Sequence, residues 1–372
     1  MIAAPAKHLL FCALLVLAAC TPRADVMPKA APDGIGTDVT VFVGTTRTRT
    51  ETGDFESSDR GDLGFARIDV SIPPAHEAGR VEVGGENPDP KKHFLSRSIQ
   101  PMGASRFRDE VAQQLAANPQ YHGEVFVFVH GFNNTMGDGV FRTAQIASDL
   151  GIHALPVHYA WPSGGHPLGY PFDRDSALYA RNGLQHLIEE LTASGAKNII
   201  LLAHSMGSQV TMETLRQMSL SGRGAAWDRI GGVVLMAPDL DVDLFRQQAG
   251  DIGPLPQPFL ILASQRDAVL RLSARLTGQD ERLGNISSID DLSALEVIVI
   301  DLSGVRDTWN SHMVAVASPT IIRLMSDPEL VESAFQSAQS ARLGLLPGTI
   351  LTVQNATEII LDPASASQIE ED

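Results

Sequence analysis

The sequence contains few of the features that mark several common classes of protein. Its 372 residues include only two cysteines, which excludes a disulfide-dense scaffold or a zinc site built on thiolates. It has 28 Lys and Arg against 44 Asp and Glu, and this net charge of −16 argues against a general nucleic-acid-binding protein. It also lacks H-E-x-x-H, a Walker A motif and a G-x-G-x-x-G after an apolar run. We therefore expect no metal, no cofactor and no nucleic-acid partner.

The N-terminus carries the pattern of a secretory signal. Lys7 precedes an apolar run at residues 9–19, which is about half the length needed to cross a bilayer. The run ends in L-A-A-C, which resembles the lipobox of bacterial lipoproteins. That resemblance implies cleavage before Cys20, whose thiol then carries a lipid such as palmitate. An ordinary signal peptide with an incidental cysteine is the alternative.

The domain organisation follows from changes in composition. Residues 20–36 are rich in Pro, Ala and Asp without an apolar period, and they predict a flexible tether. The main domain is expected over residues 37–326, followed by a C-terminal helix and a mobile acidic tail over residues 327–372. Thr21 after the cysteine resembles the signal for delivery to the outer membrane. We therefore expect a protein of the bacterial cell envelope, anchored on the periplasmic side.

Short apolar runs alternate with helix-like stretches through the main domain. Continuous Val, Ile, Leu and Phe runs are typical of strands buried on both faces. They occupy residues 125–129, 154–160, 198–203, 232–236, 259–263 and 295–300, and residues 39–43 and 66–72 predict an early antiparallel edge. Helical periodicity is found at residues 139–150, 174–194 and 206–220. This alternation predicts an α/β fold, with a mostly parallel central sheet and helices on both faces.

The clearest motif is a strand, a turn with serine at its apex, and a helix. Residues 198–207 read N-I-I-L-L-A-H-S-M-G. They resemble the nucleophile elbow, G-x-S-x-G, of the alpha/beta-hydrolase superfamily, with Ala203 in place of the first glycine and Gly207 retained. The resemblance implies an alpha/beta-hydrolase fold with Ser205 as the catalytic nucleophile. Small residues are needed because the serine is strained and the neighbouring backbone approaches closely.

A second turn follows an apolar run about 70 residues upstream of Ser205. Residues 130–134 read H-G-F-N-N. In the superfamily an H-G-x loop supplies one donor of the oxyanion hole, and the residue after the nucleophile supplies the other. The resemblance implies that the backbone N–H groups of Phe132 and Met206 form this hole. His130 is expected to brace the loop.

The triad order in this superfamily is serine, acid, histidine. The acid is expected after residues 259–263, where Asp267 stands. A carboxylate there would hold the Nδ1–H of an imidazole. Asp239 and Asp241 follow the preceding apolar run, and they remain alternatives because some members carry the acid at that earlier position.

The catalytic base must follow the last strand, and the sequence offers one candidate. His312 is the only histidine after His204. We therefore expect His312 to take the proton of Ser205 and to return it to the leaving alcohol.

The region 159–165, Y-A-W-P-S-G-G, follows another apolar run, where ligands bind in such sheets. Trp161, Tyr170 and Phe172 are expected either to line a substrate pocket or to belong to the core. The chain combines four motifs: this Y-A-W-P-S-G-G segment, H-G-F-N-N, A-H-S-M-G, and I-P-P-x-H at residues 72–76. The combination is similar to that of a family of bacterial hydrolase-like proteins of undefined substrate.

Together these features predict a serine hydrolase, esterase- or lipase-like, with a Ser-Asp-His triad and an acyl-enzyme intermediate. Its partners would be a small-molecule or lipid ester substrate, and a membrane through the lipid anchor. Two alternatives stay open: a catalytically inactive envelope lipoprotein that keeps the fold for binding, and an acyltransferase or amidase with the same triad.

Overall fold

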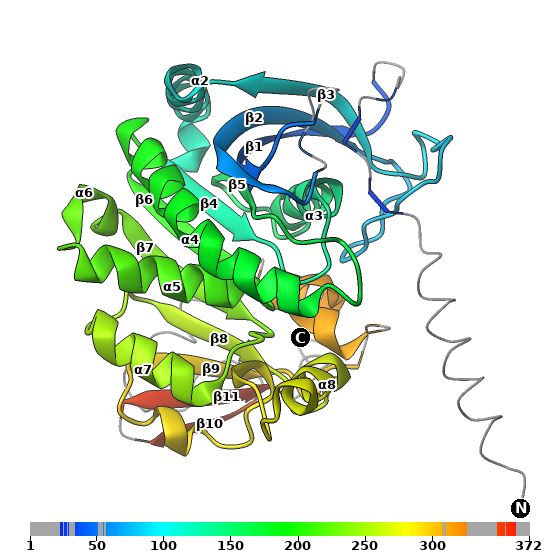
Figure 1. Cartoon of the computed structure of the whole chain (residues 1–372). Helices are drawn as coiled ribbons and strands as arrows, with labels where there is room; N and C mark the ends of the chain where they lie inside the picture. The colour runs from blue at the N-terminus through cyan, green and yellow to red at the C-terminus, as the bar shows by residue number, and fades with distance from the viewer. Residues whose placement is uncertain are drawn as a thin grey trace, which may run out of the picture.

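The computed structural model of the chain describes residues 23–24, 26–27, 29, 34–50, 55, 57–306, 308, 310–325, 348–353 and 355–361. The predicted signal, Cys20, the predicted helix after residue 327 and the acidic tail lie outside the described residues. One twisted sheet runs through the molecule, with helices on both of its faces (Figure 1).

The sheet has 11 strands. They are β1 (Thr37–Arg47), β2 (Arg60–Ile72), β3 (Leu95–Met102), β4 (Glu124–Val129), β5 (Leu155–Ala160), β6 (Asn198–His204), β7 (Ile230–Met236), β8 (Phe259–Ala263), β9 (Val297–Asp301), β10 (Gly348–Val353) and β11 (Ala356–Leu361). Their order is β10-β11-β9-β8-β7-β6-β4-β5-β1-β2-β3. All neighbours from β11 to β1 pair in parallel, whereas β10, β2 and β3 pair antiparallel. The predicted α/β fold with a mostly parallel sheet is confirmed.

Helices cover both faces of the sheet. They are α2 (Ala104–Ala117), α3 (Met136–Asp149), α4 (Tyr170–Ala193), α5 (Gly207–Leu220), α6 (Gly224–Trp227), α7 (Val242–Ile252), α8 (Ala268–Thr277), α9 (Val314–Ala317) and α10 (Pro319–Met325). Short 3₁₀ segments span Pro119–Tyr121, Leu283–Asn285, Ile289–Leu292 and Ser311–Met313. One core cluster joins the sheet to α2, α4, α5 and α7. Two others join the opposite face to α3, α9 and α10. Among the described residues, no helix combines the length and apolarity that a membrane crossing requires.

The central strands form where the sequence predicts them, because they are buried on both faces. In β4, Val125 to Val129 are all 2% exposed or less. A strand without a solvent face needs no polar alternation, and this produces the continuous apolar runs. The early antiparallel pair is also present, as β1 and β2, although β3 rather than β1 forms that edge of the sheet.

Two boundaries of the main domain differ from the prediction. The sheet does not end near residue 326, because β11 adds in parallel to β9 and β10 pairs with β11. The segment predicted as a tether is packed at some of its described residues, although Arg23 and Met27 are exposed. Ala24 and Val26 are 4% and 0% exposed within a core cluster, and the amide of Lys29 donates to the Ser96 carbonyl. Two small apolar side chains in a polar stretch are enough to bury it locally, although they create no period in the sequence.

Candidate active site

Ser205 stands in the tight turn between β6 and α5. Its φ angle is 52°, in the left-handed region that a serine rarely adopts. Gly207 has no room for a side chain, since a Cβ there would lie 2.4 Å from the Val129 carbonyl oxygen. Ala203 is fully buried between β4 and β7 and fits without a glycine. The turn therefore has the backbone strain and close packing that the elbow motif requires.

His312 and Asp267 come together from different strand ends. Asp267 follows β8, and His312 follows β9 in a 3₁₀ turn. The Nδ1 atom of His312 lies 2.7 Å from Oδ2 of Asp267, so Nδ1–H donates to the carboxylate. Asp267 is 0% exposed, and its Oδ1 accepts from the amides of Val269 and Leu270 at the start of α8. One buried carboxylate thus begins a helix and orients the imidazole.

The two alternative acids are engaged elsewhere. Asp241 is the N-cap of α7 and accepts from the Leu244 amide at 2.8 Å. Asp239 forms an ion pair with Arg282 at 3.1 Å and accepts from the Ser273 hydroxyl at 2.6 Å. Asp267 is therefore the carboxylate that the geometry places on His312.

The loop after β4 closes over the serine. A Cβ on Gly131 would lie 2.8 Å from Cβ of Ser205, so glycine is needed for this approach. Phe132 lines the same cavity as Ser205. Met206 is the N-cap residue of α5, where the first N–H groups of a helix have no intrahelical partner. The predicted oxyanion donors thus belong to two segments that meet at the serine.

A buried carboxylate from α4 fixes this loop, and sequence reasoning missed it. Asp173 is 0% exposed and accepts from the Asn133 amide at 3.2 Å, the Gly164 amide at 2.7 Å and the Ser163 hydroxyl at 2.5 Å. Burial raises the pKa of Asp173, although these hydrogen bonds oppose the rise. Only the position of Asp173 near the start of α4 could have pointed to it, since the sequence around it forms no motif.

His130 braces the loop through its neighbours. Its Nδ1 lies 2.9 Å from the Gly131 carbonyl and its Nε2 lies 3.0 Å from the Trp161 carbonyl. Burial holds the pKa of His130 well below its usual range. Trp161 stacks on this ring at 4.9 Å and is 0% exposed. Trp161 therefore belongs to the core, the other of its two predicted outcomes, and its indole N–H donates to the His130 carbonyl.

Phe172 also lies away from the cavity. It is 41% exposed, and the guanidinium of Arg60 lies 4.9 Å from its ring centroid. Tyr170 does line the cavity, as one of the two predicted outcomes requires. Its hydroxyl donates to Asp239 at 3.0 Å and contacts Ser273 at 2.8 Å. With Arg282, these residues form a polar cluster in the cavity region that the sequence did not predict, because its members come from four separate segments.

A cavity of about 510 Å³ opens beside the serine. Ser205, His312, Gly131 and Phe132 line it, and the apolar side chains of α8 form another wall. Two cations that the sequence did not predict, Arg23 and Arg142, also line it. Its volume suits a small ligand or part of a larger one.

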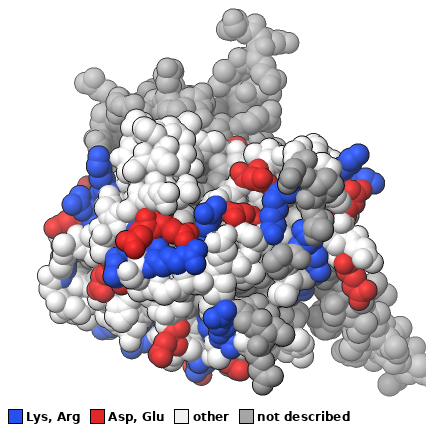
Figure 2. Space-filling view, turned by 90° about the horizontal axis from the view of Figure 1, so that it is seen from above, with Lys and Arg blue, Asp and Glu red and all other residues white. Residues whose placement is uncertain are grey.

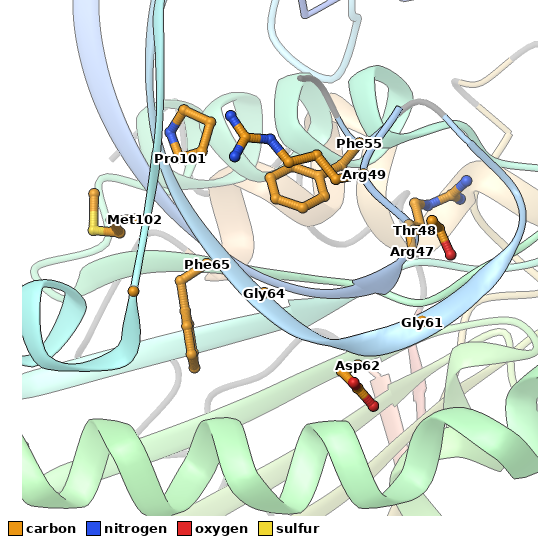
Figure 3. Close-up of a pocket in the computed structure, with 11 residues that line it drawn as sticks. Arg47, Thr48, Arg49, Phe55, Gly61, Asp62, Gly64, Phe65, Pro101 and Met102 are labelled. Atoms are coloured by element: carbon orange, nitrogen blue, oxygen red, sulfur yellow. The ribbon is translucent and has the colours of Figure 1, made fainter. Parts of the chain in front are cut away.

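A second cavity, of about 540 Å³, lies between β1, β2 and the end of β3 (Figure 3). Its lining includes Arg49 lying over the ring of Phe55, and the end of β3 contributes Pro101 and Met102. None of the residues of the predicted triad lines this second cavity. Within the described ranges, no group of three or more His, Cys, Asp or Glu side chains is placed to hold a metal ion.

The topology and the site together define a class. Ser205, Asp267 and His312 follow the parallel strands β6, β8 and β9, whose carboxyl ends lie at one edge of the sheet. This order of serine, acid and histidine on a mostly parallel sheet is that of the alpha/beta hydrolases.

A family model described as alpha/beta hydrolase of unknown function (DUF900) matches residues 104–327, more than half of the chain. The chain belongs to this family. Among curated proteins, none matches it significantly.

Solved structures with some similarity include esterases and a lipase. The chain is 11% identical to an esterase from Rhizomucor miehei, with 82% of this chain and 86% of that chain covered and a TM-score of 0.35. It is 13% identical to an esterase from Pyrobaculum calidifontis, with 88% of this chain and 89% of that chain covered and a TM-score of 0.31. Lipase B from Aspergillus fumigatus is 14% identical at a TM-score of 0.27, over 38% of this chain and 37% of the lipase.

Proposed function

We propose that this protein is a serine hydrolase that cleaves carboxylic esters with Ser205, His312 and Asp267, and that Cys20 anchors it to the bacterial envelope through lipid. The observation that carries the catalytic proposal is the 2.7 Å contact between His312 Nδ1 and Asp267 Oδ2, in a site where Ser205 and His312 line one cavity. In a catalytic triad, a histidine held in this way uses its other ring nitrogen as the base for the serine hydroxyl.

The chemistry proceeds in two halves. Ser205 Oγ attacks the ester carbonyl while His312 Nε2 takes the hydroxyl proton, and Asp267 stabilises the imidazolium. The oxyanion accepts hydrogen bonds from the backbone N–H groups of Phe132 and Met206. His312 then protonates the leaving alcohol, and the acyl group stays on Ser205. Water, activated by the same imidazole, releases the acid.

Ser205→Ala tests the nucleophile. We expect kcat for a short p-nitrophenyl ester to fall by roughly 10³-fold or more, because the covalent route is removed. Labelling by a fluorophosphonate probe should disappear as well. Ser208→Ala is the matched control, since the Ser208 hydroxyl donates to the Ala203 carbonyl within the turn and Ser208 is not among the described residues that line the cavity.

Near-native turnover by Ser205→Ala, with an unchanged circular dichroism spectrum, would contradict the proposed nucleophile. A wild-type protein that resists the probe would favour a binding lipoprotein instead. Labelling of Ser205 without ester hydrolysis would favour an amidase, or an acyltransferase if an added alcohol or amine accepts the acyl group.

Cys20→Ser tests the anchor. The change removes the thiol that the lipobox-like sequence offers for acylation, so we expect the protein to leave the membrane fraction and to lose incorporation of an alkyne-labelled palmitate. Cys12→Ser is the control, because Cys12 lies within the apolar run. Equal labelling of wild type and Cys20→Ser would rule out lipidation at this residue.

A further inference from the structure

Helix α8 exposes an apolar stripe beside the cavity. The stripe consists of Val269, Leu272 and Leu276, which are 40%, 56% and 69% exposed. Their spacing of three and four residues places them on one side of the helix, within about 60° of arc. All three line the cavity that contains Ser205 and His312. The stripe is therefore at the mouth of the candidate active site.

The flank of the same helix is basic. Arg271 and Arg275 are exposed, and α8 contains no acidic residue. This differs from the chain as a whole, whose net charge is −16, and from the face over α2 and β3, where acidic and basic side chains lie side by side (Figure 2). An apolar stripe with arginines beside it is typical of helices that lie in the interface of a bilayer. Leu168, 81% exposed and next to the cavity-lining Pro167, adds apolar surface near the mouth.

The N-terminal segment reaches the same mouth. Arg23 lines the cavity, donates to the Asn133 carbonyl at 2.9 Å and pairs with Asp138 at 3.0 Å. Cys20 precedes Arg23 by three residues, and three extended residues span at most about 10 Å. A lipid on Cys20 would therefore keep the backbone of Arg23, whose side chain lines the cavity, within about 10 Å of the anchored residue.

We propose that the apolar stripe of α8 is a membrane-contact surface, which rests on a phospholipid bilayer containing anionic lipid and holds the cavity mouth against it. The consequence for substrate rests on the proposed function: esters would reach Ser205 from the bilayer rather than from bulk water. Arg271 and Arg275 strengthen the contact through the surface charge, by roughly fivefold in partitioning for each arginine.

The test places a single environment-sensitive fluorophore on the full-length chain. Cys12 and Cys20 are the only cysteines, so a Cys12→Ser, Cys20→Ser background leaves an introduced thiol alone. Adding Ser205→Ala keeps hydrolysis out of the measurement, so failure of the proposed function cannot be mistaken for failure of the contact. The label goes on Leu272→Cys or, as a matched control, on Leu220→Cys, which is 63% exposed at the far end of α5.

With vesicles of phosphatidylcholine and phosphatidylglycerol at millimolar lipid, we expect the label at position 272 to shift to the blue. Nitroxide-bearing lipid should quench it, while the label at position 220 stays in water. Replacing Arg271 and Arg275 by Gln should lower partitioning by about 5- to 25-fold. Equal responses at the two positions, or no response at 272, would overturn the proposal. So would an apolar environment at 272 before vesicles are added, because another segment of this chain or a second copy would then cover the stripe.

Discussion

The two walls of the cavity are built on different principles. The loop wall, residues 131–135 with residues 163–164, is held by many polar contacts, three of them to the buried carboxylate of Asp173. In the helix wall, α8 with Asp267, a single residue has two tasks: Asp267 caps the helix and also holds His312. Backbone donors cannot adjust by rotating a side chain, so their wall must be fixed at several points. An imidazole needs only one well-placed acceptor.

The largest expected effect on catalysis tests the contact between Asp267 and His312. In Asp267→Asn, the amide can present its N–H₂ to His312 and favour the wrong tautomer, so kcat/KM should fall by about 10³- to 10⁴-fold. Asp241→Asn is a close control, since both residues are helix N-caps and asparagine caps about as well as aspartate. Ester kinetics and thermal unfolding of both variants provide the comparison. Equal, mild losses in kcat/KM would mean that neither carboxylate is the triad acid.

A smaller effect, on both stability and kcat, is expected when the loop wall is altered at Asp173. Asp173→Asn removes the charge and one of the oxygens that serve Asn133, Ser163 and Gly164, so the free energy of unfolding should fall by about 2–4 kcal/mol. We expect kcat to fall too, because the loop carrying the Phe132 amide loosens. Asp175→Asn, exposed on the same helix, should change stability by less than about 0.5 kcal/mol. Denaturant unfolding measures both, and a stable Asp173→Asn protein would show that the loop wall does not depend on this carboxylate.

The smallest effect concerns the contacts of His76 at the C-terminal end of α3, the helix that follows the loop wall. His76, from the I-P-P-x-H motif, contacts Asp149 of α3 at 2.8 Å and Glu82 at 2.9 Å. Burial lowers the pKa of His76, but the two carboxylates more than offset this, so the net shift is upward from 6.5. A raised pKa gives stability that is complete below the unfolded value of about 6.5 and is lost as pH rises through the folded value.

Wild type should therefore be less stable at pH 8 than at pH 6, because its stability falls as pH rises from about 6.5 through the raised pKa of His76. His76→Gln should flatten this dependence, whereas His153→Gln, an exposed histidine, should leave it intact. Urea unfolding of the three proteins at pH 6 and pH 8 measures this difference in stability. The same pH dependence of stability in wild type and His76→Gln would show that His76 does not stabilise the fold in this way. At pH 6, the His76→Gln change should have little effect on ester hydrolysis.

Continuous apolar runs predicted the strands that are buried on both faces, whereas an edge strand without such a run was missed. β4 and β6 are continuous apolar runs and form as expected. β3, LSRSIQPM, has six half-buried positions at the edge of the sheet, so it shows neither an apolar run nor a clear alternation. The docking of Ala24 and Val26 was missed for a related reason. Two buried side chains in a Pro- and Asp-rich stretch give no periodic signal.

The sequence by itself determined the strand–helix alternation and the serine turn, since each depends on residues that are close in the chain. It also left His312 as the one candidate base, because no other histidine follows His204. The tertiary structure decided which aspartate reaches His312, placed Trp161 in the core and brought Arg23 to the cavity. These outcomes depend on distances between segments tens to more than a hundred residues apart. Local composition does not contain such distances, because packing of the whole sheet sets them.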